Sequence, residues 1–213
     1  MQCFIPVPVN KNIVSQTQLP KTNNSYNNIS IKTLNGCKLQ ISQYSFLYNA
    51  EGGRGIGSHI NTKEDKFTGQ APLRYDFNLE TFHVPPLTST TAQSDGWIPF
   101  PPFLKVDVVP DIIQGNIYEE SGKVELKFKS RFLVSMGSSY KAPPLHINMI
   151  LTTEELKGAL TKKSARGMRL GKNGKCKLVG VAKVDTIDDN YINFLLGLPS
   201  ECHASFKAII SFY

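Results

Sequence analysis

The sequence predicts a mainly β domain with one short helix, in which about six to eight strands form an antiparallel half-barrel or sandwich over residues 71–213. Three observations predict this fold class. Apolar and polar residues alternate with a period of two through much of the region, Gly, Pro and Asn separate the alternating runs, and one segment has the capping residues of a helix. A region of this length can bury its own core without disulfides or a metal.

The first expected strand covers residues 73–79, where apolar and polar side chains alternate. Five prolines then follow between residues 85 and 102. Because proline has no N–H to donate to a sheet and fixes its own backbone, we expect this connection to run over the surface. Its aromatic residues Trp97, Phe100 and Phe103 are expected to pack inward, and a proline-rich ligand for another protein is the alternative.

Valine and isoleucine are frequent in residues 104–109 and 112–118, which predicts two strands separated by Pro110. After a turn, residues 124–134 place apolar side chains at even positions and charged ones at most odd positions. This is the pattern of a long antiparallel strand with one face on the core and one in water. We therefore expect the even positions to be buried and the odd ones to be exposed.

Three further strands are expected at residues 144–152, 177–184 and 203–213, each rich in apolar residues. The segment that follows the first of them is ambiguous. Residues 153–160 begin with Thr-Glu-Glu-Leu, which suits a short helix, but the same segment also fits a strand edge that turns into a basic loop.

The main helix is expected near residues 187–197. Thr186 or Asp188 can cap its N-terminus, where acidic side chains also suit the helix dipole, and Gly197 with a following proline ends it. The apolar stripe expected to lie on the sheet consists of Ile192, Leu195 and Leu196.

The first 50 residues contain no Asp or Glu, whereas residues 51–213 carry all seventeen. The opening also has four lysines, no arginine and eight Ser or Thr residues. This composition resembles a chloroplast transit peptide, which implies a protein of the plastid stroma or of a plastid membrane surface. A disordered Asn-rich tail is the alternative. We expect residues 1–50 to be this segment, disordered, and residues 51–70 to be a glycine-rich linker.

Residues 162–177 hold seven basic side chains and no acidic one, so the rest of residues 51–213 has a net charge of −4. The Asn173-Gly174 pair within this segment predicts a hairpin or loop tip. We expect the partner to be an anionic membrane surface or an acidic protein. Nucleic acid is disfavoured because no aromatic residues interleave for base stacking, and a plainly solvated loop is the alternative. The candidate binding residues are Lys162, Lys163, Arg166, Arg169, Lys172, Lys175 and Lys177.

The sequence shows no motif for catalysis or for a cofactor. Its four cysteines and four histidines have neither metal-ligand spacing nor the spacing of a Cys/His nucleophile pair. The sequence contains no run of 18 apolar residues, so it predicts no membrane-spanning helix. We therefore expect no cofactor and no metal. An enzyme is the third hypothesis, which a cleft that brings together His146, His203 or Cys202 would favour.

The sequence favours two non-catalytic functions over an enzyme. The first is a plastid binding or assembly module that acts through the β-rich domain and its basic loop. The second is a carrier of a lipid or another hydrophobic ligand, because a curled sheet closed by a helix can enclose an apolar cavity. An apolar cavity inside the sheet favours the carrier, and a packed interior favours the assembly module.

Overall fold

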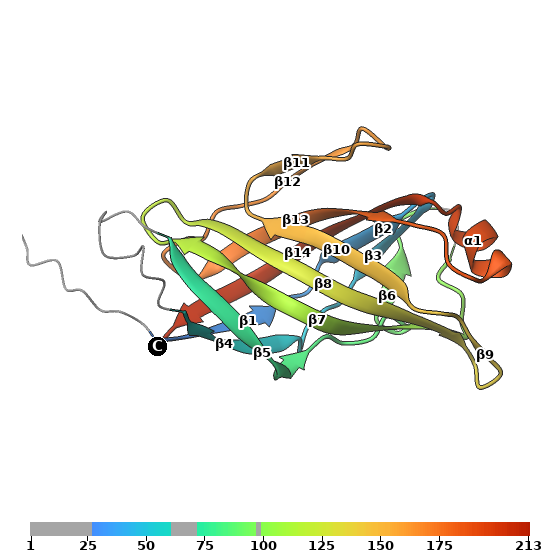
Figure 1. Cartoon of the computed structure of the whole chain (residues 1–213), viewed down its shortest axis with the longest axis horizontal. Coiled ribbons are helices and arrows are strands. Elements are labelled where there is room, and N and C mark those ends of the chain that lie inside the picture. Colours follow the sequence, from blue (N-terminus) through green and yellow to red (C-terminus); the bar gives the residue numbers. More distant parts are fainter. Residues whose placement is uncertain (1–26, 61–71, 97–98) are drawn as a thin grey trace, which may run out of the picture.

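The computed structural model describes residues 27–60, 72–96 and 99–213. In these residues the regular structure is one large antiparallel sheet, a small hairpin and one short helix (Figure 1). The elements are β1 (Asn28–Thr33), β2 (Cys37–Ile41), β3 (Tyr44–Tyr48), β4 (Arg54–His59), β5 (Leu73–His83), β6 (Ala92–Ser94), β7 (Leu104–Tyr118), β8 (Lys123–Met136), β9 (Tyr140–Lys141), β10 (Leu145–Thr152), β11 (Glu155–Lys157), β12 (Ser164–Arg166), β13 (Lys175–Val184), α1 (Asn190–Leu196) and β14 (Ser200–Phe212).

Eight strands of the large sheet form a ring, and the predicted mainly β class with one short helix is confirmed. Neighbouring strands follow the order β1-β4-β5-β7-β8-β10-β13-β14, and β14 pairs back with β1. A ring of eight strands encloses a space just wide enough to be filled by side chains or to hold one small ligand. The interior of the ring is therefore the first place to look for a site.

The ring is not a regular barrel, because two neighbouring strands separate along part of their length. In the described residues β5 pairs with β7 from Leu73 to Asp76, and its second half leaves β7. Further along β7, Val106 bridges instead to Leu87 in the connection after β5. The second half of β14 pairs with β1, but its first half pairs with β2, from which β3 and β6 continue the sheet. The wall beside β14 is thus built by β1 in one half of the ring and by β2, β3 and β6 in the other.

The core lies on the inner face of the ring. In β8 the even positions from Val124 to Val134 are buried, as predicted, but the odd positions are half-buried and not exposed. The reason is that β8 lies between β7 and β10, whose side chains partly cover its outer face. The predicted strands at residues 144–152, 177–184 and 203–213 correspond to β10, β13 and β14. Together with β8 they are neighbours in the sheet, although β10 and β13 pair only at Thr152 and Val179.

Residues 28–59 form four strands, where the sequence suggested a disordered segment and a linker. The glycine-rich run is β4, whose inward positions are glycines. A Cβ atom on Gly55 would lie 2.0 Å from Cδ2 of Phe82, and one on Gly57 would lie 3.0 Å from Cγ2 of Ile29, so both glycines make room for large neighbours. A strand with glycines on its inner face lacks the apolar alternation that identifies strands in a sequence. The remainder of both expected segments lies outside the described residues.

Residues 104–118 form one strand, β7, instead of the two predicted. Asp111 is the extra residue of a β-bulge between Pro110 and Ile112, and bulges are among the places where a strand accommodates proline. In the ambiguous segment 153–160, the strand alternative is confirmed, because β11 pairs with β12 there.

The aromatic residues of the proline-rich connection differ in their environment. Phe100 is buried against Phe46, with ring centroids 5.0 Å apart, as predicted. Phe103 is 78% exposed, so the prediction was wrong for this residue. Phe103 lies in the turn that precedes β7, which the backbone N–H of Leu104 closes by donating to the Pro101 oxygen, and residues at such a turn lie at the surface. Trp97 lies outside the described residues.

The predicted helix is α1, and its cap differs from the prediction. Asp189, rather than Thr186 or Asp188, is the N-cap, and its carboxylate accepts a hydrogen bond of 2.9 Å from the backbone N–H of Ile192. Gly197 ends the helix with a positive φ of 59°, the left-handed conformation that glycine adopts most easily. The fully buried Ile192 fixes α1 to the core, as expected.

Candidate functional site

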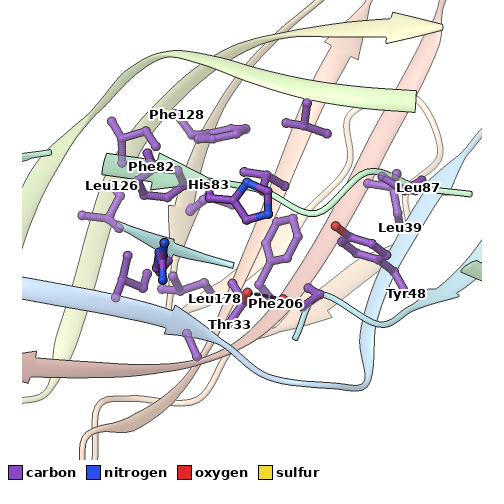
Figure 2. Close-up of a pocket in the computed structure, with 18 of the residues that line it drawn as sticks. Thr33, Leu39, Tyr48, Phe82, His83, Leu87, Leu126, Phe128, Leu178 and Phe206 are labelled. Carbon is purple, nitrogen blue, oxygen red and sulfur yellow. Dashed lines mark hydrogen bonds between the residues drawn. The ribbon is translucent and has the colours of Figure 1, made fainter. Parts of the chain in front are cut away.

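The ring encloses an apolar cavity. The volume that the centre of a water molecule can occupy in it is about 70 Å³. Its wall comes from both halves of the ring, and the aromatic side chains of Phe82, Phe128 and Phe206 gather around it with His83 (Figure 2). Leu39 and the other aliphatic residues of the wall complete a mostly hydrocarbon surface. A molecule held here would exchange water for apolar contacts.

Two polar side chains of the wall already have partners. The Thr33 hydroxyl donates to the backbone oxygen of Ala50, and the Tyr48 hydroxyl donates to the backbone oxygen of Pro85. Burial raises the pKa of Tyr48, which keeps the phenol neutral and able to donate. These two bonds tie together the connections that run between the two halves of the ring.

Arg54 and His83 are the exposed residues of the cavity wall, and we call their position the mouth of the cavity. They face each other as cross-strand partners, Arg54 at the start of β4 and His83 at the end of β5. Residues paired in this way have Cα atoms about 4.5–5.5 Å apart. The ladder shifts register between Arg54 and Ile56, so this pair lies at an irregular point of the wall, where one basic and one imidazole side chain start from neighbouring backbone positions.

A buried hydroxyl without a partner lies in β8 near the cavity. Ser130 is 2% exposed and stands between the inward positions Phe128 and Phe132, which both line the cavity. Among the described residues its Oγ has no hydrogen-bond partner. Since an unsatisfied buried hydroxyl costs about 1–3 kcal/mol, Ser130 is a place where a water or a bound molecule could accept a bond.

The predicted basic segment does not form one patch. Lys162 and Lys163 lie in the turn of the hairpin β11–β12, which we call the arm, and Figure 1 shows the arm as a separate hairpin beside β13. Both lysines are exposed, and neither forms an ion pair with another described residue. Arg166 lies in β12 and pairs with Glu155 at 3.3 Å. The arm therefore presents two unpaired cations at its turn.

The other four cations lie away from that turn. Arg169 donates to Glu154 at 2.8 Å, which lowers the pKa of the Glu154 carboxyl. Lys172 lies in the predicted Asn173-Gly174 turn, and Lys175 and Lys177 lie at the start of β13. The structure thus divides the seven candidate residues between the arm, one ion pair and a second turn.

One buried carboxylate attaches the arm to the outside of the ring. Glu201 in β14 is 3% exposed and accepts hydrogen bonds from the backbone N–H groups of Leu160 and Thr161, at 2.8 and 2.9 Å. The Thr161 hydroxyl donates to the same carboxylate at 2.7 Å and lies 2.8 Å from Nε2 of His203. Burial alone raises the pKa of Glu201, but these hydrogen bonds outweigh it and lower the pKa to about 2. The charged form of Glu201 is therefore the one that holds the arm.

The cluster of Glu201, His203 and Thr161 lacks the geometry of a nucleophilic triad. In a triad the nucleophile and the acid bind opposite nitrogens of the histidine, whereas here the Thr161 hydroxyl and the Glu201 carboxylate both approach Nε2. Cys202 lies between Glu201 and His203 in β14, so its side chain points to the opposite face of the sheet. His146 is exposed on β10. The structure therefore does not bring together the three residues that an enzyme hypothesis would need.

Burial also explains the cysteines. It raises the pKa of the Cys176 and Cys202 thiols to about 12, so both are protonated at neutral pH. Among the described residues, no three His, Cys, Asp or Glu side chains gather closely enough to hold a metal ion. The same residues contain no helix long and apolar enough to cross a membrane.

Sequence reasoning missed Arg54, His83 and Glu201. Arg54 lies in a glycine-rich run, and such a run is typical of a linker. Nothing in the sequence indicates that Arg54 pairs with His83. The signal for Glu201 is slightly better, because a single acid within an otherwise apolar and small-residue strand start suggests a buried partner. Comparison with known proteins adds no further residue: no protein-family model, no curated protein and no solved structure matches this chain.

Proposed function

We propose that the protein is a carrier or binding protein for a small hydrophobic ligand, which it holds inside the ring. The observation that supports this proposal is the apolar cavity, lined from both halves of the ring, with its mouth at Arg54 and His83. A cavity of this kind favours the carrier over the assembly module, because a purely structural ring gains stability when side chains fill its interior.

The size of the cavity limits the ligand. One water needs roughly 10–15 Å³ of the same kind of volume, so 70 Å³ corresponds to about five or six non-hydrogen atoms. The proposed guest is therefore the apolar part of a compact molecule, or the end of an alkyl chain whose remainder leaves through the mouth. Each buried CH₂ group contributes about 0.8 kcal/mol, which is about a fourfold change in affinity.

A series of straight-chain alcohols from butanol to decanol tests this proposal. We expect the Kd, measured by NMR titration of the purified protein, to fall by about fourfold per CH₂ until the cavity is full and then to level off. The variant Phe206→Ala enlarges the cavity and should move the levelling point to longer chains. Phe194→Ala is the matched control, because Phe194 is 88% exposed on α1.

Two results would contradict the proposal. The first is the absence of binding throughout the alcohol series. The second is an affinity that rises with chain length identically in wild type, Phe206→Ala and Phe194→Ala, since this would mean that the alcohols bind on the surface. Native mass spectrometry of protein purified from its source then identifies the natural ligand.

A second proposal concerns the arm, and it keeps part of the predicted basic site. We propose that Lys162 and Lys163 contact an anionic membrane surface or an acidic protein. The exposed, unpaired position of the two lysines on a hairpin fixed by Glu201 supports this. Each lysine near an anionic membrane adds about 1 kcal/mol of attraction, which salt screens.

Vesicles with and without anionic lipid test the arm. The double variant Lys162→Gln, Lys163→Gln should bind anionic vesicles more weakly than wild type at low salt. Lys172→Gln, Lys175→Gln is the matched control, since these residues lie at the second turn. Equal loss in both variants would mean that binding follows net charge and not the arm.

Plastid import is the third proposal, and the acid-free opening supports it. The structure changes the expected cleavage point. Loss of about 50 residues would remove β1, β2 and β3, and β1 and β2 both pair with β14. We therefore propose cleavage before Asn28, which N-terminal sequencing of the mature protein tests. An intact Met1 would end the idea of import, and a terminus near residue 50 would contradict the described ring as the mature form.

A further inference from the structure

We infer that the ligand of the ring cavity is amphipathic, with an apolar tail inside the ring and one anionic head group, a carboxylate or a phosphate, bound by Arg54 and His83 at the mouth. This inference rests on the proposed function and adds the chemical class of the ligand. It is argued from the position of the two side chains, from their lack of partners and from the charges around them.

The position comes first. Arg54 and His83 are both part of the cavity wall and are cross-strand partners beside a register shift of the ladder, so their backbones are close enough for both side chains to reach one head group. Figure 2 shows His83 among the side chains that line the pocket, together with Phe82 and Phe206. A guanidinium presents a planar fork of donors that matches the oxygens of a carboxylate or a phosphate.

The two side chains also have unused capacity. Among the described residues, neither the Arg54 guanidinium nor the His83 ring takes part in a hydrogen bond or an ion pair. The other polar groups of the wall, the hydroxyls of Thr33 and Tyr48, already donate to backbone oxygens. The free donors therefore gather at the mouth, whereas the interior is apolar.

Acidic side chains could compete for Arg54, and the nearest ones along the chain do not. Glu51 precedes Arg54 by three residues and Glu80 precedes His83 by three, yet neither forms an ion pair with a described residue. An anionic head group would thus meet an arginine that no described acidic residue neutralises. A cationic head group would meet repulsion at the same place.

Four compounds with the same six-carbon tail separate the possibilities: hexanoate, hexyl phosphate, hexanol and hexylamine. We expect hexanoate or hexyl phosphate to bind wild-type protein about five- to tenfold more tightly than hexanol, because the alcohol cannot pair with Arg54. Hexylamine should bind more weakly than hexanol. Comparison of the two anions tells which head group the mouth prefers.

The variant Arg54→Gln should remove the preference for anions and leave the Kd of hexanol within about twofold, because the tail site is unchanged. Arg74→Gln is the matched control, since Arg74 is an exposed arginine of β5 that does not line the cavity. Equal binding of hexanol and both anions to wild type would overturn this inference and leave the proposed function standing. An anion preference that survives in Arg54→Gln would also overturn it. Absence of binding by all four compounds would overturn the proposed function itself, and this inference with it.

Discussion

Replacing Glu201 by Gln should release the arm from the ring, and the pH dependence of this effect can be worked out from the structure. In the folded protein the pKa of Glu201 is about 2, against an ordinary value of 4.5. Burial pushes this pKa up, but the N–H groups of Leu160 and Thr161 and the Thr161 hydroxyl push it down further. The difference between the two values corresponds to about 3 kcal/mol in favour of the charged, folded state.

The sign follows from the lowered pKa. Because the folded value lies below the unfolded value, the stabilisation is fully present above about pH 4.5 and is lost as the pH falls toward 2. At neutral pH, Glu201→Gln should therefore weaken the attachment of the arm by up to about 3 kcal/mol. The gap between wild type and the variant should close between pH 4.5 and 2.

Hydrogen exchange at the Leu160 and Thr161 amides measures the attachment directly, and denaturant unfolding measures how much of it contributes to global stability. Glu80→Gln, an exposed glutamate of β5 whose side chain has no bond in the described residues, is the control. The reasoning is refuted if both amides stay as protected in Glu201→Gln as in wild type at pH 7. It is also refuted if the unfolding free energies of the two proteins run parallel from pH 7 to pH 2.

Three further predictions concern the interior. Ser130→Ala should raise the unfolding free energy by about 1 kcal/mol, because it removes a buried hydroxyl that has no partner among the described residues. A lower stability in denaturant unfolding would show that the hydroxyl binds a water or a ligand. Gly55→Ala should destabilise the fold by about 1–3 kcal/mol, because the new Cβ meets the Phe82 ring. Gly96→Ala is the control and should change stability by less than about 0.5 kcal/mol, because no described atom lies within 4 Å of its new Cβ. Equal effects of the two variants in thermal unfolding would contradict this prediction. Cys176 and Cys202 should resist alkylation at pH 8 in the native state and react after unfolding, as peptide mass mapping can follow, and rapid native modification would contradict their raised pKa values.

The part of the fold that sequence reasoning predicts well is the part with regular alternation. From Val124 to Val134 in β8 each apolar side chain at an even position is buried, and the strand predictions for β10, β13 and β14 succeed for the same reason. In strand β4 the apolar side chain lies on the outer face: Ile56 is 43% exposed, whereas Gly55 and Gly57 face inward. The space that these glycines leave is filled by Phe82 and Phe77, which come from another strand. Such complementarity between strands has no local signature in the sequence.

The candidate site was harder to predict than the fold, because its parts depend on which elements meet. A run of seven cations is visible in the sequence, but ion pairs to Glu154 and Glu155 and a second turn divide it in space. Glu201 lies under the arm only because β14 places it there, forty residues after Leu160 and Thr161. Long-range contacts of this kind decide which charges are free, and composition alone does not contain them.

The position of the cavity mouth follows from how the ring is closed. The chain passes between the two halves of the ring three times: from β1 to β2, from β3 to β4, and from β5 to β6. Arg54 directly follows the second passage and His83 directly precedes the third. Each passage interrupts the hydrogen-bonded ladder on this side of the ring. On the other side β8 pairs with β10, and β13 with β14, along most of their length, whereas β10 and β13 pair only at Thr152 and Val179. The irregular closure of the ring thus explains why the exposed residues of the cavity wall, Arg54 and His83, lie together: both flank passages at which the chain leaves the ladder.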